Sequence, residues 1–408
     1  MPDGLRFHIV EDDPDIVAIV EQLLRAAGHQ LTTSTDSHTA IDDIRERRPD
    51  CVLLDIMMPG VDGLELCRRI RQDESLRSMK IIMVTAKAFK FDERRSVELG
   101  ADGYILKPIR PTTFVSRLER IVSNEFHLRF WGSRGTLPVP GRRSLRYGGN
   151  TSCVSLSFPG GGLFVFDAGT GIKELGDELM RSAERVHAKI FISHPHWDHI
   201  NGFPFFAPLY APGNNFEILG PSYGKLTIAQ LLTDQMEGAH SPMTTREFAG
   251  QVAFTDLNEG SFEVEGVEVR AMLLSHPGTC LGYRMELAGR SFCYITDNEL
   301  FLPSSSYYSE HYVERLTTFI EGCDVLVTDA AYTDDGYLSK VGWGHSCVSQ
   351  VAWLAHAANV KNLCLFHHDP DQDDEDIDAK LASVEKRLRE LGSSANCTAS
   401  AEGDLIRF

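Results

Sequence analysis

The stretch "FISHPHWDHINGF", residues Phe191–Phe203, places three histidines and an aspartate within six positions. His194 and His196 alternate at the end of an apolar run, so both side chains can project from a strand exit toward one point. Asp198 and His199 follow on the turn and aim toward a second point. Imidazole and carboxylate groups bind Zn²⁺, and also Mn²⁺ or Fe²⁺. Because a cluster of this kind has few structural uses, the stretch predicts a metal site.

The stretch and further ligands elsewhere in the chain would together supply more ligands than one tetrahedral ion needs. Such further ligands would therefore indicate two metals. The candidates each follow an apolar run or lie in a glycine turn: His276 in "LLSHPGT", Asp297 in "YITDNE", His345 in "GWGHS", and His367 and His368 in "LFHHDP". A lone histidine after a strand is more often a packed or surface residue, and the histidines outside these motifs are interpreted in that way.

The sequence from Phe126 onward predicts many strands with a few interspersed helices, the pattern of an α/β sandwich of two sheets. Helices are expected at about 222–237 and 346–359, among others. The predicted strands are "HLRFWGS" (127–133), "CVSLSF" (153–158), "LFVFDAG" (163–169), "KIFISH" (189–194), "FEILG" (216–220), "VEVRAMLLSH" (267–276), "CLGYRMEL" (280–287), "SFCYITD" (291–297), "VLVTDAA" (325–331) and "NLCLFHH" (362–368).

Residues 5–123 instead alternate short apolar runs with amphipathic segments, which predicts a parallel, doubly wound (βα)5 sheet covered by helices on both faces. The predicted strands are "RFHIV" (6–10), "HQLTTST" (29–35), "CVLLDI" (51–56), "KIIMVTA" (80–86) and "GYILK" (103–107). The fold class is therefore α/β, with one domain over residues 1–124 and a second over 125–408.

Charged and polar residues stand at the ends of these predicted strands: Glu11 and Asp12, Asp55, Thr85 and Lys107. Strand ends gather at one edge of an open parallel sheet. Three carboxylates there would repel one another unless a hard cation lies among them, and Mg²⁺ fits. Mg²⁺ and Lys107 could neutralise a phosphoryl group in transfer to Asp55 as the nucleophile. Each acidic residue alone could merely cap a strand or a turn, but the joint pattern favours a phosphorylation site.

The first domain resembles the receiver domain of two-component response regulators over essentially its whole length. The resemblance implies phosphorylation of Asp55 by a cognate sensor histidine kinase, with Thr85 and Tyr104 relaying the state to the face formed by helix 4, strand 5 and helix 5. It also implies that the protein can form a homodimer through this domain. A cis peptide is expected between Lys107 and Pro108.

Residues 126–408 resemble the metallo-β-lactamase fold, which implies an αββα sandwich. Within that fold the likeness is to the branch of ribonuclease Z and cyclic-nucleotide phosphodiesterases. It rests on "GSRGTLPVP" and "YGGNTSC" before "FVFDAGTG", on "HPGTCLGYRM" around His276, and on the turn His345-Ser346 before "LCLFHHDP".

This resemblance implies two metal sites with one shared ligand. His367 is preferred to His368 because it directly follows the strand, and Asp167 in "FDAG" matches an aspartate that orders the metal loop. The implied ligands are His194, His196 and His276 for one metal, Asp198, His199 and His367 for the other, and Asp297 as the bridge.

The resemblance also implies a mechanism. Two ions about 3.5–4 Å apart can activate water and clamp a phosphodiester for in-line attack. His345 would stabilise the developing charge or protonate the leaving oxygen, with Asp329 orienting it, and the alternative for His345 is a plain turn histidine. The expected catalytic residues are therefore His345, Asp198 and Asp329. A histidine rather than a glutamate at position 196 argues against an oxygen-reducing di-iron relative.

The negative charge of the second domain limits the kinds of substrate that it can bind. The net charge is −18, and residues 125–408 hold 22 Lys and Arg against 37 Asp and Glu. Long polyanions bind through many basic contacts, so extended nucleic acid is a poor partner. The interval of about 222–250, where ribonuclease Z enzymes carry a basic arm, has little positive charge. A small anionic phosphodiester such as a cyclic nucleotide is the expected substrate.

Three other functions stay open: a metal-dependent acyl hydrolase for lactones, thioesters or β-lactams, a ribonuclease Z-like RNA nuclease, and a signalling module whose metal site is a relic. The sequence has no apolar run long enough to span a membrane and no signal-peptide pattern at its start. Its nine cysteines are scattered without a C-x-x-C motif, which favours reduced thiols. A cytoplasmic protein is expected.

Overall fold

The computed structural model describes residues 4–86, 90–159, 161–182, 185–237 and 243–408. The chain divides into two compact units, of which the first comprises Met1–Phe126 with Ser157–Gly162, and the second His127–Leu156 with Leu163–Phe408. No helix in the described ranges is both long enough and apolar enough to cross a membrane.

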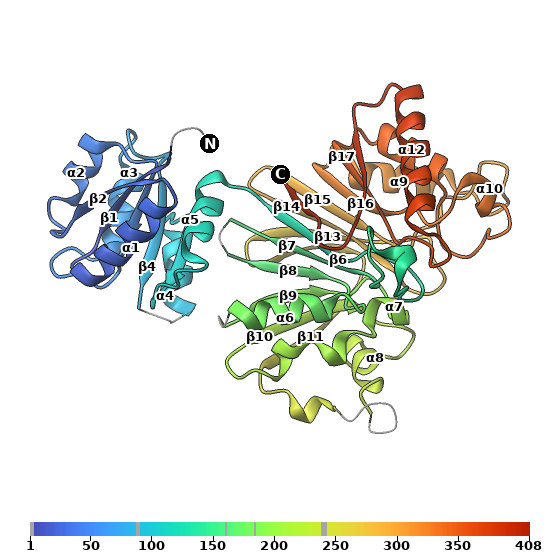
Figure 1. Cartoon of the computed structure of the whole chain (residues 1–408), viewed down its shortest axis with the longest axis horizontal. Helices are drawn as coiled ribbons and strands as arrows, with labels where there is room; N and C mark the ends of the chain where they lie inside the picture. The colour runs from blue at the N-terminus through green and yellow to red at the C-terminus, as the bar shows by residue number, and fades with distance from the viewer. Residues whose placement is uncertain (1–3, 87–89, 160, 183–184, 238–242) are drawn as a thin grey trace. The chain divides into compact units, whose positions relative to one another are not determined.

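The first unit is a parallel sheet of five strands in the order β2-β1-β3-β4-β5, with helices between consecutive strands (Figure 1). This confirms the predicted doubly wound arrangement. The strands are β1 (Arg6–Val10), β2 (Gln30–Ser34), β3 (Cys51–Leu54), β4 (Lys80–Thr85) and β5 (Gly103–Leu106). The helices are α1 (Pro14–Ala26), α2 (Ala40–Arg47), α3 (Gly63–Gln72), α4 (Lys90–Glu98) and α5 (Phe114–Ser123).

Alternation along the strands explains why helices cover both faces of this sheet. In β1, Phe7 and Ile9 pack in one buried cluster with residues of α1 and α5. Val10 packs in a second cluster with residues of α2 and α3. Successive side chains of a strand point to opposite faces, so a strand with apolar residues on both faces must be covered on both sides. Strands β1 and β3 are neighbours, and their ends therefore bring Glu11 and Asp55 to the same edge.

The second unit contains two sheets of seven strands. The first sheet has the order β11-β10-β9-β8-β7-β6-β19 and consists of β6 (His127–Gly132), β7 (Cys153–Ser157), β8 (Leu163–Phe166), β9 (His187–Phe191), β10 (Asn215–Pro221), β11 (Gln251–Leu257) and β19 (Leu405–Arg407). The second runs in chain order and consists of β12 (Gly260–Val264), β13 (Val267–Leu273), β14 (Leu281–Leu287), β15 (Arg290–Ile295), β16 (Val325–Asp329), β17 (Asn362–Phe366) and β18 (Asn396–Ala399).

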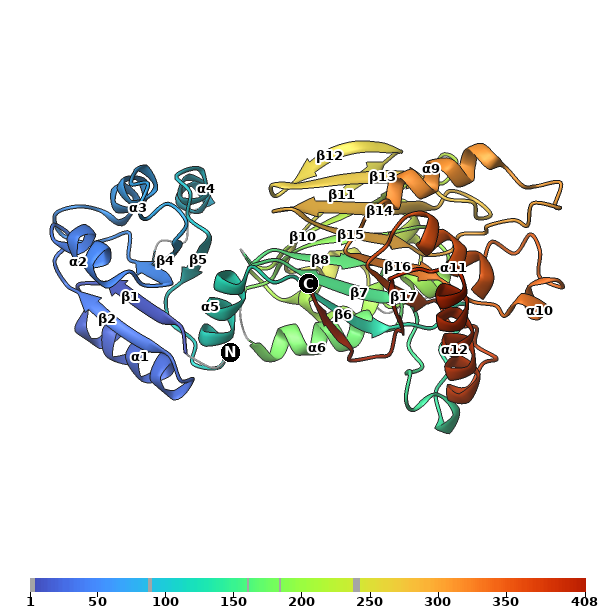
Figure 2. The same ribbon diagram turned by 90° about the horizontal axis from the view of Figure 1, so that it is seen from above.

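Helices flank the two sheets. The α-helices are α6 (Ile172–Ser182), α7 (Trp197–Ile200), α8 (Ile228–Asp234), α9 (Glu310–Ile320), α10 (Asp334–Tyr337), α11 (Val348–Ala357) and α12 (Asp374–Glu390). Short 3-10 turns are η1 (Arg142–Ser144), η2 (Phe203–Phe205), η3 (Ala207–Tyr210) and η4 (Thr245–Glu247). Apolar residues of α6 and α8 pack on the first sheet, and those of α9, α11 and α12 pack on the second. Figure 2 shows α6 along the first sheet and α9, α11 and α12 along the second.

Aromatic side chains fill the space between the two sheets. Phe166 of the first sheet stacks on Phe191, with ring centroids 5.6 Å apart. It also contacts Phe292 at 5.1 Å and Tyr294 at 5.3 Å, both in the second sheet. With helices outside each sheet, the layers are helix, sheet, sheet and helix, which confirms the predicted αββα sandwich.

The ten strands predicted for this unit are all present, and β11, β12, β18 and β19 were missed. All four missed strands lie at the edges of the two sheets. An edge strand is paired on one side only, so its sequence need not contain a continuous apolar run. The helix expected over about 222–237 is shorter, because the Thr227 side chain caps α8 together with Gln230. Part of the interval compared with the ribonuclease Z arm, residues 238–242, lies outside the described residues.

Candidate metal centre

The metal-binding candidates lie where strands end. β9 ends at Phe191 shortly before His194, β15 ends at Ile295 before Asp297, and β17 ends at Phe366 directly before His367. Asp297 and His367 have positive φ angles of 45° and 55°. Non-glycine residues adopt this conformation rarely, and here the two backbones turn sharply at the point where the side chains enter the cluster.

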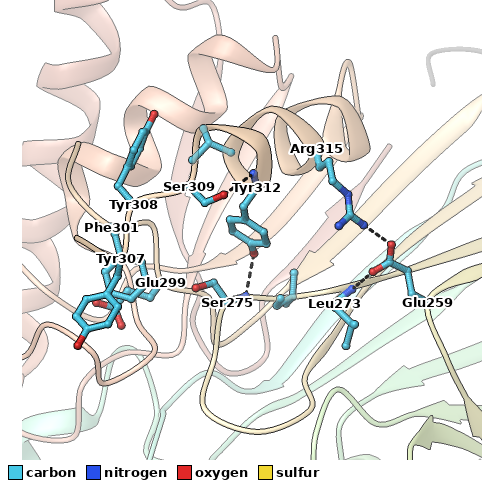
Figure 3. A pocket seen from close by; sticks show the side chains of 12 residues that line it. Glu259, Leu273, Ser275, Glu299, Phe301, Tyr307, Tyr308, Ser309, Tyr312 and Arg315 are labelled. Atoms are coloured by element: carbon cyan, nitrogen blue, oxygen red, sulfur yellow. Dashed lines mark hydrogen bonds and ion pairs between the residues drawn. The ribbon is translucent and has the colours of Figure 1, made fainter. Parts of the chain in front are cut away.

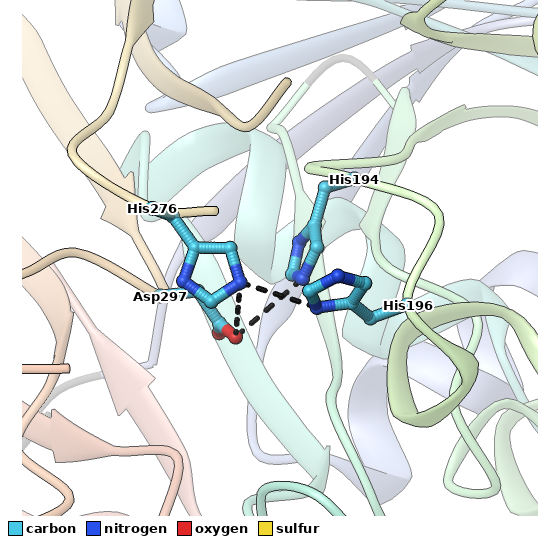
Figure 4. Close-up of side chains that lie close together, drawn as sticks. All are labelled: His194, His196, His276 and Asp297. Atoms are coloured by element: carbon cyan, nitrogen blue, oxygen red, sulfur yellow. Dashed lines mark hydrogen bonds and ion pairs between the residues drawn. The ribbon is translucent and has the colours of Figure 1, made fainter. Parts of the chain in front are cut away.

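One group of ligand atoms comes from His194, His196, His276 and Asp297, which all lie within 4.8 Å of one another (Figure 4). Asp297 Oδ2 is 3.5 Å from His194 Nε2 and 3.7 Å from His276 Nε2. His276 Nε2 is 3.1 Å from His196 Nδ1. His194 Nε2 is buried and has no hydrogen-bond partner in the described part of the chain. A buried, unpaired nitrogen directed at three other ligand atoms fits a divalent metal ion.

A second group comes from Asp198, His199, His367 and the same Asp297. Asp297 Oδ1 is 3.3 Å from His199 Nε2 and 3.2 Å from His367 Nε2. Asp198 Oδ2 is 3.1 Å from His367 Nε2 and 3.2 Å from His199 Nε2. The two oxygens of Asp297 therefore face different groups, which is the arrangement of a bridging ligand.

Electrostatics in the two groups favour bound cations. Burial raises the pKa of Asp297, but the nearby imidazoles of His367, His199 and His194 outweigh burial and hold it well below its usual range. Burial lowers the pKa of His199, yet the carboxylates of Asp198, Asp297 and Asp167 raise it well above its usual range. The buried carboxylates around His199 therefore stabilise a positive charge next to them, which a proton or a divalent ion can supply.

Asp167 supports the centre from behind. Its carboxylate accepts hydrogen bonds from His199 Nδ1 at 2.7 Å, from Tyr294 OH at 2.8 Å, and from the backbone N–H of Ser193 at 2.7 Å. The contact to Nδ1 fixes the tautomer of His199 and leaves Nε2 for a metal. These are the contacts of a residue that orders the metal loop, the role expected for Asp167.

The adjacent histidines His367 and His368 lie in different environments. His367 joins the second group, whereas His368 Nε2 donates a hydrogen bond to the Ser400 carbonyl at 3.1 Å. His368 Nδ1 is 3.2 Å from Lys380 Nζ, and burial lowers the pKa of this lysine to about 7. His368 is therefore occupied on both ring nitrogens away from the cluster.

His345 lies beside the second group. Its Nδ1 donates to Asp329 Oδ2 at 2.7 Å, and its ring stacks on His367 with centroids 4.8 Å apart. Burial lowers the pKa of His345, but Asp329, Asp297 and Asp198 outweigh burial and raise it to about 9. The structure thus brings His345 and Asp329 together beside His367, whose group also contains Asp198.

Sequence reasoning missed a backbone contribution from the segment around Gly135. Thr136 N–H donates to Asp198 Oδ2 at 2.7 Å. A Cβ at Gly135 would lie 2.1 Å from His367 Cε1, so only glycine fits against this ring. The available signal was the "GSRGT" motif, which carried the family resemblance without a role for its residues.

In the first unit, Glu11, Asp12 and Asp55 place carboxylate oxygens within 4.8 Å of one another. Lys107 Nζ is 2.6 Å from Glu11 Oε2 and 2.9 Å from Asp55 Oδ2. Burial raises the pKa of Glu11, although Lys107 opposes this shift. This acidic cluster, in which Glu11 and Asp55 are buried and Asp12 is exposed, fits Mg²⁺.

The receiver switch candidates lie close by in the sheet. Thr85 ends β4 and is buried, and Tyr104 in β5 is also buried. The Lys107 backbone N–H donates to the Thr85 carbonyl at 2.8 Å. The peptide bond between Lys107 and Pro108 is cis, as expected.

Two family models match this chain. Residues 7–119 match the response regulator receiver domain, and residues 163–368 match the β-lactamase superfamily domain. Together the matches include the candidate residues of both sites, whereas residues 127–156 and 369–408 of the second unit, with the segment around Gly135, lie outside them.

Similar proteins fall into the same two classes. The DNA-binding response regulator MtrA of Mycolicibacterium smegmatis is 35% identical over 156 residues, which are 38% of this chain and 67% of that protein. The transcriptional regulatory protein BaeR of Escherichia coli is 40% identical over 117 residues, 29% of this chain and only 48% of that protein. Among solved structures, the metallo-β-lactamase fold protein YhfI from Bacillus subtilis matches over 70% of this chain and 100% of that chain, with 15% identity and a TM-score of 0.49.

Proposed function

The chain belongs to the β-lactamase superfamily and carries a response regulator receiver domain, and from this premise we propose that it is a two-component response regulator whose output is a metal-dependent phosphodiesterase. The proposed substrate is a small phosphodiester such as a cyclic nucleotide. The observation that carries the proposal is the pair of ligand groups that share Asp297, with the His345–Asp329 pair beside them.

The proposed centre holds two divalent transition metals, with Zn²⁺ preferred and Mn²⁺ or Fe²⁺ as alternatives, because its donors are mainly imidazoles with two carboxylates. When bound, two such ions supply Lewis-acid activation of water and neutralise charge on a phosphoryl group. The chain's own contribution is to fix imidazoles by a contact on their other nitrogen, as Asp167 does for His199 and the Gly344 carbonyl does for His276.

His345 has the proposed role of acid. Asp329 occupies the Nδ1 side of the ring, which leaves Nε2 to hold a proton for the leaving oxygen. The Asp329 carboxylate raises the pKa of His345, which favours the form of the ring that carries this proton. A phosphodiester needs both a cationic contact for its charge and a proton for its leaving alkoxide, and a protonated imidazole meets both needs.

The receiver domain has the proposed role of regulator. A sensor histidine kinase would phosphorylate Asp55 with Mg²⁺ held by Glu11, Asp12 and Asp55. Lys107 already contacts Asp55 Oδ2, so it can neutralise charge on the phosphoryl oxygens once the bond forms.

The proposal is tested by a panel of substrates with the metal content measured. The protein would be loaded with Zn²⁺ or Mn²⁺ and assayed on bis(p-nitrophenyl) phosphate, cyclic nucleotides, a lactone, a thioester and a transfer-RNA precursor. Turnover of the small phosphodiesters that disappears on chelation and returns with metal supports the proposal. Turnover of the carbonyl substrates alone indicates an acyl hydrolase, processing of the RNA alone indicates a nuclease, and a fully loaded but inactive protein indicates a signalling module.

A further inference from the structure

Glu299 is a buried carboxylate two residues after Asp297. Its Oε1 accepts hydrogen bonds from Tyr337 OH and from Gly342 N–H, both at 2.8 Å. Its Oε2 accepts one from Gly344 N–H, also at 2.8 Å. A single carboxylate therefore anchors the glycine loop that precedes His345.

That loop in turn contacts a metal-ligand candidate. The Gly344 carbonyl accepts a hydrogen bond from His276 Nδ1 at 3.0 Å, which directs Nε2 of this ring toward Asp297 and His196. Gly344 has a φ of +90°, and a Cβ there would lie 2.1 Å from His276 Nδ1. The loop must therefore hold glycine at this position, and its placement decides where His276 points.

The backbone around Glu299 is hydrogen-bonded to the residues next to His276 and His345. Its N–H donates to the Ser275 carbonyl at 2.8 Å, next to His276. Ser346 Oγ, one residue after His345, donates to the Asn298 carbonyl at 2.5 Å. The segment that carries Asp297 is thus connected on one side to His276 and on the other to His345.

Glu299 also lines a cavity of about 350 Å³ beside α9, together with Phe301, Tyr307 and Tyr312 (Figure 3). The three hydrogen bonds accepted by its carboxylate restrain Tyr337 and the loop that contains Gly342 and Gly344.

We infer that Glu299 is a positioning residue of the metal centre, which fixes the orientation of His276 and the place of His345 through the loop Gly342–Gly344. The inference rests on the proposed function for the existence of two metals. Glu299→Gln keeps the size of the side chain but replaces one carboxylate oxygen by an NH₂ group. That group faces a backbone N–H in either amide orientation, so one buried donor loses its acceptor.

The test is a competition titration of the metal-free protein with Zn²⁺ against a chelator of known affinity. In wild type we expect two equivalents to bind. In Glu299→Gln we expect one equivalent to weaken by about 10- to 100-fold while the other is unchanged. Gly344→Ala acts on the same contact from the His276 side and should weaken the same single equivalent.

Glu217→Gln is the matched control, since the Glu217 carboxylate accepts hydrogen bonds from Lys189 and Thr255 within the first sheet. It should bind both equivalents as wild type does. Unchanged affinity in Glu299→Gln, or equal weakening of both equivalents in step with a lower melting temperature, would overturn the inference. The titration uses no substrate, so a failure of phosphodiester turnover in wild type would count against the proposed function and leave this result intact.

Discussion

Asp329 Oδ2 accepts a hydrogen bond from Nδ1 of His345 at 2.7 Å, and this contact joins the end of β16 to the glycine loop beside the metal-ligand candidates. Asp329 is fully buried and is held in turn by the backbone N–H of Ala331 at 2.8 Å. The pair is therefore built as a unit, in which the carboxylate fixes the imidazole and favours its protonated form.

Removal of this imidazole should reduce turnover while the metal stays bound. His345→Ala is expected to lower kcat on bis(p-nitrophenyl) phosphate by about 100- to 10,000-fold, the usual contribution of a positioned acid. Asp329→Asn should cause a smaller loss because the imidazole remains. Metal content is measured alongside kcat, and Asp335→Asn on the exposed side of α10 serves as the control. An unchanged kcat in His345→Ala would assign this residue to the turn alone.

The two adjacent histidines should respond in opposite ways to the same substitution. His367→Gln removes a nitrogen that lies 3.2 Å from Asp297 Oδ1, so it should lose one metal equivalent and the activity. His368→Gln removes contacts to Ser400 and Lys380 instead, so it should lower stability and retain both metals. Elemental analysis of the purified proteins decides between them, and loss of metal from His368→Gln alone would reverse the assignment.

Acid should destabilise the first unit through His8. This buried ring lies 2.8 Å from Thr32 Oγ1, and burial, with a smaller effect of Arg47, lowers the pKa of His8 from 6.5 to about 4. Between those two values the unfolded chain binds a proton that the folded unit excludes. The stability is therefore fully present above pH 6.5 and is lost as the pH falls toward 4.

The measurement is hydrogen exchange of β1 and β2 peptides in wild type and His8→Gln at matched pH. Protection in the variant should depend less on pH across that window than protection in wild type. Parallel pH profiles of the two proteins would show that another group controls the acid response.

Phosphorylation should depend on Asp55 and on a divalent cation. With acetyl phosphate and Mg²⁺ we expect one phosphoryl group per wild-type chain and none in Asp55→Asn, read by intact-protein mass spectrometry. Asp62→Asn is the matched control, because Asp62 caps α3 and asparagine caps a helix equally well. Incorporation that persists in Asp55→Asn would place the phosphorylation at another residue.

The sequence was most informative where function concentrates unusual residues. The spacing of His194, His196, Asp198 and His199 predicted a metal cluster because few other structures use such a pattern. Short apolar runs that alternate with amphipathic segments predicted the parallel sheet of the first unit, because strands buried on both faces need continuous apolar sequence. Strands that lie at sheet edges, such as β18 and β19, carry a weaker signal and were missed.

Contacts between distant segments could not be predicted from local patterns. Thr136 contacts Asp198 through a backbone N–H, a group that every residue except proline has, so the motif that contains Thr136 does not reveal this contact. Glu299 lacks a motif of its own, and its role depends on a loop more than forty positions away, as the 45-residue separation from Gly344 shows. Glycines such as Gly135 and Gly344 are visible in the sequence, but only the folded chain reveals which ring each one accommodates.

Anomalous diffraction from crystals grown with Zn²⁺ tests whether Asp297 bridges a dinuclear centre. We expect two metal peaks about 3.5–4 Å apart on either side of the Asp297 carboxylate. One peak should lie among His194, His196 and His276, and the other among Asp198, His199 and His367. A single peak at full occupancy in the presence of excess Zn²⁺, or two peaks without Asp297 between them, would rule out a dinuclear centre bridged by Asp297.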